Sequence, residues 1–270
     1  MRDRLPVRLA PSFHPKIWGA TDLQPWFPRA EEKIGEVWFP PPPELPILVK
    51  FLFTSARLSV QVHPEDHYAR RHENSAGKTE MWHILRAGPG AEIALGFREP
   101  ISRERLREAS VSGEIEGLLR WIPVEPGETY FTPAGTVQAI GGGLALCEIQ
   151  QVSDVTYRLY DYGRPRQLHL DKGVEVSDLG RHPGAAVRAP LGENRDLLVH
   201  SPYFTTELLV LYREAKQSYE QPHLLVLIEG EGMLGPRHCR AGEVWLASPG
   251  DEFSVSPAGV LRMLLTSIPA

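Results

Sequence analysis

Short apolar runs separated by glycine and proline follow one another along most of the chain, and many of them alternate with polar residues at the two-residue period of a β-strand. Strands are expected at ILVKFLF (47–53), LSVQVH (58–63), TEMWHIL (79–85), AEIALGF (91–97), VQAI (137–140), LALCEIQ (144–150), VTYRLYDY (155–162), YFTTELLVLY (203–212), PHLLVLIEG (222–230), GEVWLASPG (242–250) and LRMLLT (261–266). The pattern therefore predicts an all-β protein with many turns.

One region has the spacing of a helix instead. In residues 102–121 a stripe of leucine and isoleucine is interrupted at Ser112 and Gly113, so two short helices are expected as an insertion near residues 101–120.

Two stretches are expected to lack regular structure. Residues 65–79 are polar, and Asn74 and Gly77 are typical loop residues. Residues 1–46 are interpreted as irregular, with Pro40–Pro43 forming an extended surface linker.

Composition places the chain among ordinary globular proteins. Its 270 residues are 42% hydrophobic and 23% charged, with a formal net charge of −5. No block of like charge suggests a nucleic acid or membrane partner. The N-terminal residues show no apolar segment of the kind a signal peptide has, and the longest apolar runs are too short to span a bilayer. A cytoplasmic protein with reduced thiols is expected.

The two cysteines are Cys147 and Cys239. Cys147 precedes Glu148, so it is a candidate nucleophile, but a lone cysteine in LALCEI is more often a small core residue.

The run LSVQVHP carries the first candidate for chemistry. In a strand Gln61 and His63 share one face with Ser59, while the valines fill the other face. One interpretation is a half-exposed strand with a polar outer face. The other is that His63 binds a metal.

A carboxylate begins the next strand. Glu80 and Trp82 share a face there, and His83 points the opposite way, so His83 is interpreted as structural. Nitrogen and amide donors together with a carboxylate suit a borderline ion such as zinc.

Four sequence motifs together resemble those of a known protein family. They are SVQVHPEDHY (59–68), GKTEMWHIL (77–85), PAGTVQAIGGG (133–143) and EIQQVSDVTYRLYDYGR (148–164). In this order they resemble the type I phosphomannose isomerases, the mannose-6-phosphate isomerases of the cupin superfamily, and most of all their short bacterial form. The likeness covers about residues 14–180 and is fainter beyond.

This resemblance implies one divalent metal, expected to be zinc, with Gln61, His63 and Glu80 as ligands. The family's fourth ligand is a histidine in a stretch that usually reads GTVHAIG. Here the stretch reads GTVQAIG, with Gln138 in that place. An amide oxygen is a weaker zinc ligand than imidazole, so the metal is expected to bind less tightly than in relatives with the second histidine.

The resemblance also implies how the substrate is held. Ser59, Lys78 and Arg164 are the candidate substrate-binding residues, and the two cations are expected to contact a phosphate. Arg166 is interpreted as a solvated surface charge.

Two catalytic candidates come from the last motif. Glu148 acts as the base or is a paired carboxylate that orients its neighbours, and both roles remain open. Arg158 would stabilise a developing enediolate oxygen.

The implied fold consists of two cupin-type jelly rolls: a larger, metal-bearing catalytic domain over residues 1–180 and a smaller cupin-like β domain, without metal, over residues 181–270. The implied activity interconverts mannose 6-phosphate and fructose 6-phosphate through a cis-enediol, with the sugar phosphate as partner. The alternative is a non-catalytic sugar-phosphate-binding or regulatory cupin with a weakened metal site. The oligomeric state stays open.

Overall fold

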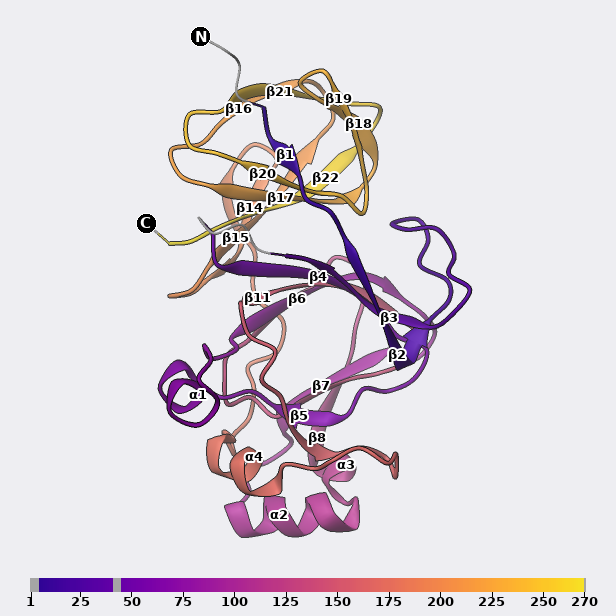
Figure 1. Ribbon diagram of the computed structural model, residues 1–270, viewed down its shortest axis with the longest axis vertical. Coiled ribbons are helices and arrows are strands. Elements are labelled where there is room, and N and C mark those ends of the chain that lie inside the picture. The colour runs from indigo at the N-terminus through magenta and orange to yellow at the C-terminus, as the bar shows by residue number, and fades with distance from the viewer. Residues whose placement is uncertain (1–4, 41–44, 270) are drawn as a thin grey trace.

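The computed structural model describes residues 5–40 and 45–269, whose strands form four sheets stacked face to face (Figure 1). A layer of helices covers the outer face of the five-stranded sheet, at the bottom of Figure 1. The protein is therefore mostly β, as the alternating pattern predicts. Most of the predicted linker Pro40–Pro43 lies outside the described residues.

Two sheets come from the N-terminal part of the chain. The five-stranded sheet has the order β12 (Tyr157–Tyr160), β5 (Val60–Val62), β10 (Gln138–Ile140), β7 (Glu92–Phe97) and β8 (Leu119–Pro123). The six-stranded sheet has the order β2 (Ser12–Ala20), β3 (Ile34–Phe39), β4 (Ile47–Phe53), β11 (Leu144–Gln151), β6 (Glu80–Ala87) and β9 (Thr129–Thr132).

The other two sheets come mainly from the C-terminal part. The seven-stranded sheet has the order β1 (Val7–Arg8), β20 (Val244–Ala247), β17 (His223–Glu229), β22 (Leu261–Ser267), β15 (Thr205–Leu211), β14 (Arg195–His200) and β13 (Ala189–Gly192). The four-stranded sheet has the order β16 (Ala215–Ser218), β21 (Glu252–Pro257), β18 (Glu231–Leu234) and β19 (Arg237–Arg240).

Alternate residues of the strands fill separate apolar layers. Trp82 and Leu146 of the six-stranded sheet pack against Ile93 and Ile140 of the five-stranded sheet. This layer matters most for function, because the polar cluster described below lies between the same two sheets. The opposite face of the six-stranded sheet packs on the seven-stranded sheet, and a further layer joins the seven-stranded and four-stranded sheets.

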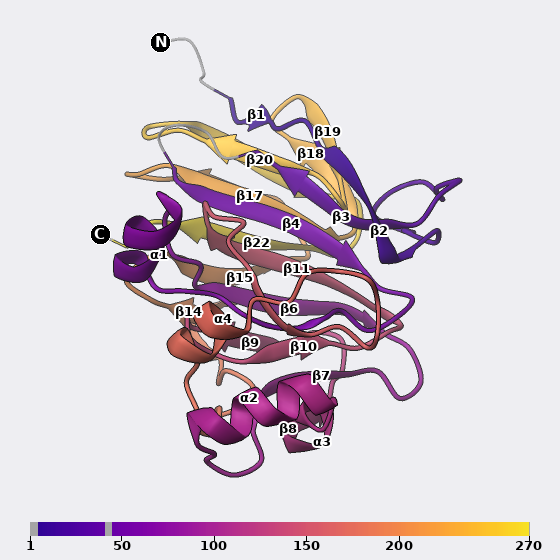
Figure 2. The same cartoon turned by 60° about the horizontal axis from the view of Figure 1, so that its bottom comes forward.

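The outer face of the five-stranded sheet is covered by helices (Figure 2). They include α2 (Arg103–Ser112), α3 (Ile115–Leu118) and α4 (Leu170–Val176). The two predicted helices are α2 and α3, and α2 is capped by Ser102, whose hydroxyl accepts a hydrogen bond from the Arg105 amide. None of the helices within residues 5–40 and 45–269 has the length and apolar composition that a membrane crossing requires.

Two expectations about irregular regions were wrong, and one helix was not predicted. Residues 65–79 contain the helix α1 (Asp66–Glu73), which ends at Asn74 in the left-handed conformation. Residues 1–46 contain β1, β2 and β3, and β3 pairs with the predicted strand β4. The helix α4 was not expected from its sequence, which contains Gly173; that glycine packs against Leu159, with no room for a side chain.

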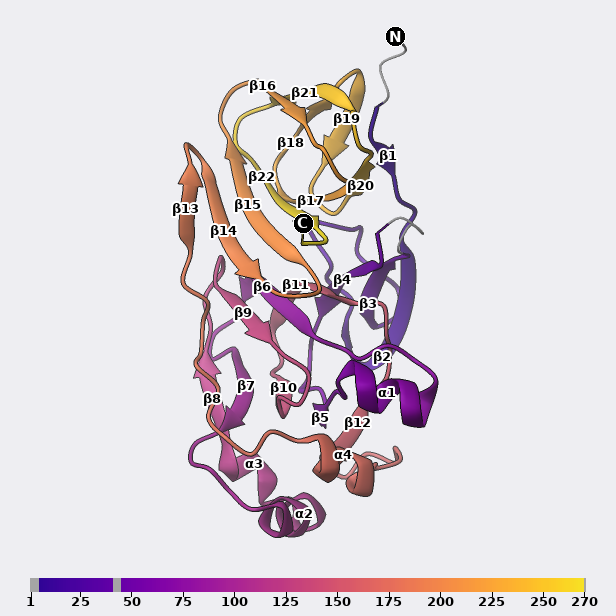
Figure 3. The same cartoon turned by 90° about the vertical axis from the view of Figure 1, so that its left-hand side faces the viewer.

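The first strand belongs to the sheet of the C-terminal part. In β1, Val7 pairs with Leu246 of β20, so this segment lies against the seven-stranded sheet before the chain crosses to the six-stranded sheet (Figure 3). The division into domains at residue 180 stays a prediction.

Candidate metal centre and active site

The predicted polar face of β5 turns towards the six-stranded sheet. Val60 and Val62 pack on the helix side, so Gln61 points the other way. Gln61 lies directly opposite Gln138 of β10 on one side and Arg158 of β12 on the other. Directly opposite residues of a ladder share a face, so β5, β10 and β12 contribute one side of the candidate site.

His63 follows β5 and is buried, with 2% of its surface exposed. Its Nδ1 donates to the carbonyl oxygen of Val155 at 2.8 Å, which leaves Nε2 as the acceptor of the ring. Burial lowers the pKa of His63 well below its usual range, and the charge of Lys78 lowers it further.

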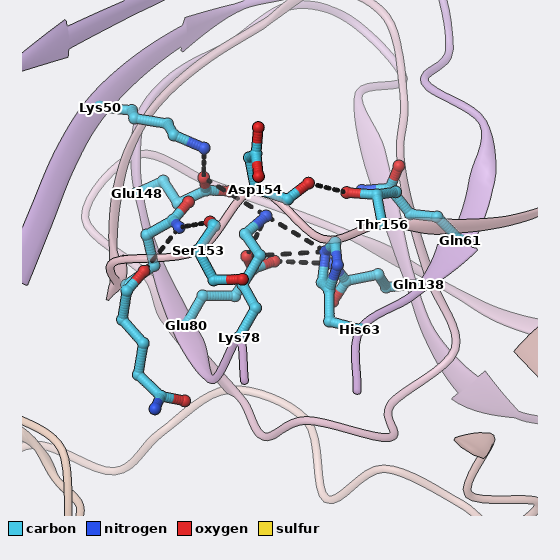
Figure 4. Close-up of polar contacts among 12 residues, drawn as sticks. Lys50, Gln61, His63, Lys78, Glu80, Gln138, Glu148, Ser153, Asp154 and Thr156 are labelled. Carbon is cyan, nitrogen blue, oxygen red and sulfur yellow. Dashed lines mark hydrogen bonds and ion pairs between the residues drawn. The ribbon is translucent and has the colours of Figure 1, made fainter. Parts of the chain in front are cut away.

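Glu80 begins β6 on the facing sheet and is fully buried. Its Oε2 lies 3.8 Å from Nε2 of His63 and 2.8 Å from Nζ of Lys78. Nζ of Lys78 is also 3.2 Å from Nε2 of His63 (Figure 4). Burial lowers the pKa of Lys78, but the carboxylates Glu148 and Glu80 outweigh this effect and raise it overall.

Gln138 joins the two sheets. Its Nε2 donates to Oε1 of Glu80 at 2.6 Å, and its Oε1 is buried and accepts no hydrogen bond from any described residue. The predicted residues Gln61, His63, Glu80 and Gln138 therefore come together in one place, although their role as metal ligands stays a prediction.

Glu148 lies in β11, beside this group. Its Oε1 is 3.1 Å from Nζ of Lys50 and 3.9 Å from Nζ of Lys78, and its Oε2 accepts a hydrogen bond from the Trp82 indole at 3.1 Å. The carboxylate thus lies between two ammonium groups, all nearly buried. These contacts match the paired carboxylate that the sequence allowed, and they also place Glu148 beside the candidate metal ligands.

Lys50 is a functional candidate that the sequence analysis missed. It is buried in β4 opposite Glu148, with its Nζ 4.5 Å from the centre of the Trp38 ring. A lysine within the otherwise apolar run ILVKFLF was the available signal, because a buried lysine needs a partner.

The remaining predicted residues lie around this cluster. Ser59 is buried and donates to Oε1 of Gln61 at 3.2 Å. Arg158 faces the same side as Gln61, but its Nη1 donates to the Gln167 carbonyl oxygen. No hydrogen bond or ion pair among the described residues joins Arg158 to His63, so the predicted contact with the reacting atoms stays untested.

Arg164 belongs to a second charged group. It pairs with the buried carboxylate of Asp161 at 2.8 Å and donates to the carbonyl oxygen of Arg57. Arg166 makes a bidentate pair with the same Asp161, at 2.5 and 2.7 Å, and keeps 28% of its side chain exposed, so it is a surface charge with a fixed partner rather than a freely solvated one. Arg57 leads into β5, which places Arg164 near the beginning of the strand that carries Gln61.

The cluster reaches the surface beside Gln61. Gln61 and Thr156 are half-buried and Asp154 is exposed, and Figure 4 shows the three residues in its upper part, to the right of Glu148 and above His63. A cleft of about 1010 Å³ lies elsewhere, at the edge between the six-stranded and seven-stranded sheets. It is lined by His83, which points away from the cluster as predicted, and by none of the predicted site residues.

Known proteins are similar to this chain in sequence and in fold. No family model matches the chain. An alignment of 277 positions with the probable mannose-6-phosphate isomerase GmuF of Bacillus subtilis shows 33% identity. This alignment covers 85% of the chain and 87% of GmuF. The chain belongs to the mannose-6-phosphate isomerase family.

Two further comparisons agree with this assignment. The mannose-6-phosphate isomerase of Streptococcus mutans is 40% identical over 199 residues, which cover 70% of this chain and 62% of that enzyme. The mannose-6-phosphate isomerase structure from Bacillus subtilis superposes with a TM-score of 0.87 at 28% identity, covering 98% of this chain and all of that one. A phosphomannose isomerase variant from Salmonella typhimurium, at 15% identity and a TM-score of 0.80, shares the fold.

The donor set of this family member fits one divalent ion. Two atoms that each lie about 2.1 Å from one zinc ion are at most about 4.2 Å apart, and Nε2 of His63 and Oε2 of Glu80 are 3.8 Å apart. Oε2 of Glu80 meets the ammonium group of Lys78 at 2.8 Å, whereas the buried Oε1 of Gln138 accepts no hydrogen bond from any described residue. A buried acceptor without a donor, such as this amide oxygen, is what a cation would satisfy.

The set is nevertheless poor in strong ligands. No group of three or more His, Cys, Asp or Glu side chains suited to a metal occurs within residues 5–40 and 45–269. A metal held beside His63 and Glu80 would therefore need other donors, and the amides of Gln61 and Gln138 are the predicted ones.

Proposed function

We propose that this protein is a metal-dependent aldose–ketose isomerase that interconverts mannose 6-phosphate and fructose 6-phosphate through a cis-enediol. One observation carries the proposal: His63, Glu80 and Gln138 meet in one buried cluster with Lys78 and Glu148. Membership of the mannose-6-phosphate isomerase family supports the choice of substrate.

The metal would be held by His63, Glu80, Gln61 and Gln138, with zinc the ion that best suits imidazole and carboxylate together. When bound, it would polarise the C1 and C2 oxygens of the sugar and so make the proton between them more acidic. The hydrogen bond from His63 to Val155 keeps the ring oriented with Nε2 towards Glu80.

The protein's own groups would then move the proton. Glu148 is the carboxylate of the cluster that the metal does not use, so we assign it as the base that carries the proton between C1 and C2. Trp82 and Lys50 fix its two oxygens, which restricts the carboxylate to one orientation. Arg158, on the same face as Gln61, would stabilise the enediolate oxygen.

Phosphate binding is assigned to Arg164 and Lys78, together with the hydroxyl of Ser59. Arg164 lies near the start of β5 and is held by Asp161. Lys78 lies at the other end of β5, beside His63 and Glu80. Ser59 lies just after Arg57, whose carbonyl oxygen accepts from Arg164, and its hydroxyl donates to Gln61. In this proposal Arg164 makes the main phosphate contact, since a guanidinium can bind two phosphate oxygens at once.

The fold supports the same assignment. We propose that the five-stranded and six-stranded sheets form one cupin-type jelly roll, which carries the metal, and that the seven-stranded and four-stranded sheets form a second, without metal. The layer of apolar residues between each pair of sheets supports this division.

A coupled isomerase assay on the purified protein tests the function. We expect turnover of mannose 6-phosphate that is lost on chelation and restored by zinc or cobalt. The rival function is a non-catalytic sugar-phosphate-binding cupin, which Gln138 favours because it weakens the metal site. Binding of mannose 6-phosphate without turnover, even in protein fully loaded with metal, would establish the rival.

A further inference from the structure

Lys78 touches both of the strongest candidate ligands. Its Nζ lies 2.8 Å from Oε2 of Glu80 and 3.2 Å from Nε2 of His63, and the side chain is almost fully buried. These are the same two atoms that a divalent ion would need. An ion within bonding distance of both atoms would meet the ammonium group at a separation too short for two cations.

We infer that Lys78 competes with the divalent metal for Glu80 and His63, and that metal binding moves its ammonium group from Glu80 to Glu148. This inference rests on the metal role of Glu80 and His63 in the proposed function.

A second position for the ammonium group is already present. Oε1 of Glu148 is 3.9 Å from Nζ of Lys78, so a small rotation of the lysine side chain brings the two into direct contact. Lysine has a flexible four-carbon chain, which makes such a movement easy. Glu148 also contacts Lys50 at 3.1 Å, and a carboxylate has enough acceptor positions for two ammonium groups.

Charge makes this competition stronger than it would be in a site with more anions. Glu80 is the one anionic residue among the four candidate ligands, and Lys78 offsets that charge. A divalent ion therefore enters a group whose net charge is zero until Lys78 leaves. Replacing the lysine by an uncharged residue of similar length should remove this opposition.

The test is a titration with cobalt, whose visible absorption reports binding to the protein directly. We expect Lys78→Met to bind cobalt at least about tenfold more tightly than the parent. Lys172→Met is the control for the loss of a lysine charge, because Lys172 pairs with Glu73 and makes no ion pair with Glu80, His63 or Glu148 within the described residues. It should change the cobalt affinity by no more than about threefold.

A double-mutant cycle tests the movement to Glu148. If Glu148 receives Lys78, then Glu148→Gln weakens cobalt binding in the parent protein, and this effect largely disappears in the Lys78→Met background. If Glu148 merely attracts the metal, the loss is equal in both backgrounds, and the proposed movement is wrong.

The melting temperature of each variant, with and without cobalt, shows whether the variant is folded. Without a partner cation Glu80 destabilises Lys78→Met, so added cobalt should raise its melting temperature more than that of the parent. Equal cobalt affinity and equal melting shifts in the parent and Lys78→Met would overturn the inference while leaving the proposed function intact. Failure of the parent, Lys78→Met and Gln138→His alike to bind cobalt would overturn the metal site itself.

Discussion

Gln138 lies directly opposite Gln61 in the five-stranded sheet, and its amide nitrogen donates to Glu80 of the six-stranded sheet. One side chain thus links the two sheets at the point where the candidate ligands meet. In relatives whose sequence has histidine here, an imidazole would stand in the same position. The consequences of that single difference can be measured.

Gln138→His should raise the metal content of the purified protein. Imidazole is a stronger zinc ligand than an amide oxygen and is mostly unprotonated at neutral pH. Metal content after mild dialysis, measured beside isomerase activity, gives the comparison. Gln24→His serves as the control, since it adds the same group at an exposed position. An unchanged metal content would mean that Gln138 is not at the metal site.

Glu148→Gln should lower kcat by about 10²–10⁴-fold with a much smaller effect on KM. The amide retains the shape of the side chain and can still accept from Trp82, but it cannot take a proton. The matched control is Glu243→Gln, because Glu243 also accepts an indole hydrogen bond, from Trp245, away from the site. A loss of kcat below tenfold would show that Glu148 only orients its neighbours.

Arg164→Ala should raise KM for mannose 6-phosphate by about 10–100-fold, because a hydrogen bond to a charged group contributes about 1.5–3 kcal/mol. Free mannose, which has no phosphate, should be affected much less. Lys78→Ala is likewise expected to raise KM for mannose 6-phosphate more than KM for free mannose. Arg213→Ala, at an exposed ion pair with Glu193, controls for loss of surface charge. Equal effects on both sugars would rule out the phosphate assignment.

His83→Gln should make the protein less sensitive to acid. Burial, with a further effect of Arg188, lowers the pKa of His83 to about 3. The unfolded chain therefore binds this proton first, and stability falls as the pH drops below about 6.5 towards 3. At about pH 5 the loss from this group is about 2 kcal/mol, relative to neutral pH.

Urea unfolding of the parent and His83→Gln at pH 8 and pH 5 measures that difference. His200→Gln is the control, because His200 contacts a threonine hydroxyl as His83 does, but is exposed. If the parent and His83→Gln lose the same free energy of unfolding between the two pH values, the buried histidine does not contribute.

The alternating pattern predicted the strands well because each sheet is buried on at least one face. The run LALCEIQ became β11, where Cys147 packs in the apolar core as expected and Glu148 faces the other sheet. Burial raises the pKa of the Cys147 thiol, which agrees with a structural role.

Local pattern failed where long-range packing decides the structure. The helix α1 has a polar sequence, and Ala69 is its buried residue, so no apolar stripe announced it. Lys50 was missed for a related reason: its charge is satisfied by Glu148, almost a hundred positions later in the chain. Asp161 likewise explains Arg164 and Arg166 through buried contacts that spacing alone does not specify.

The pairing of Val7 with Leu246 has a consequence for the order in which the chain acquires its structure during synthesis. The first strand leaves the ribosome long before its partner β20 exists, so it must wait unpaired while most of the chain is made. Contacts between such distant parts of a chain slow folding, because a large loop has to close first. The last step of folding should then be the pairing of the β1 segment with β20 in the seven-stranded sheet.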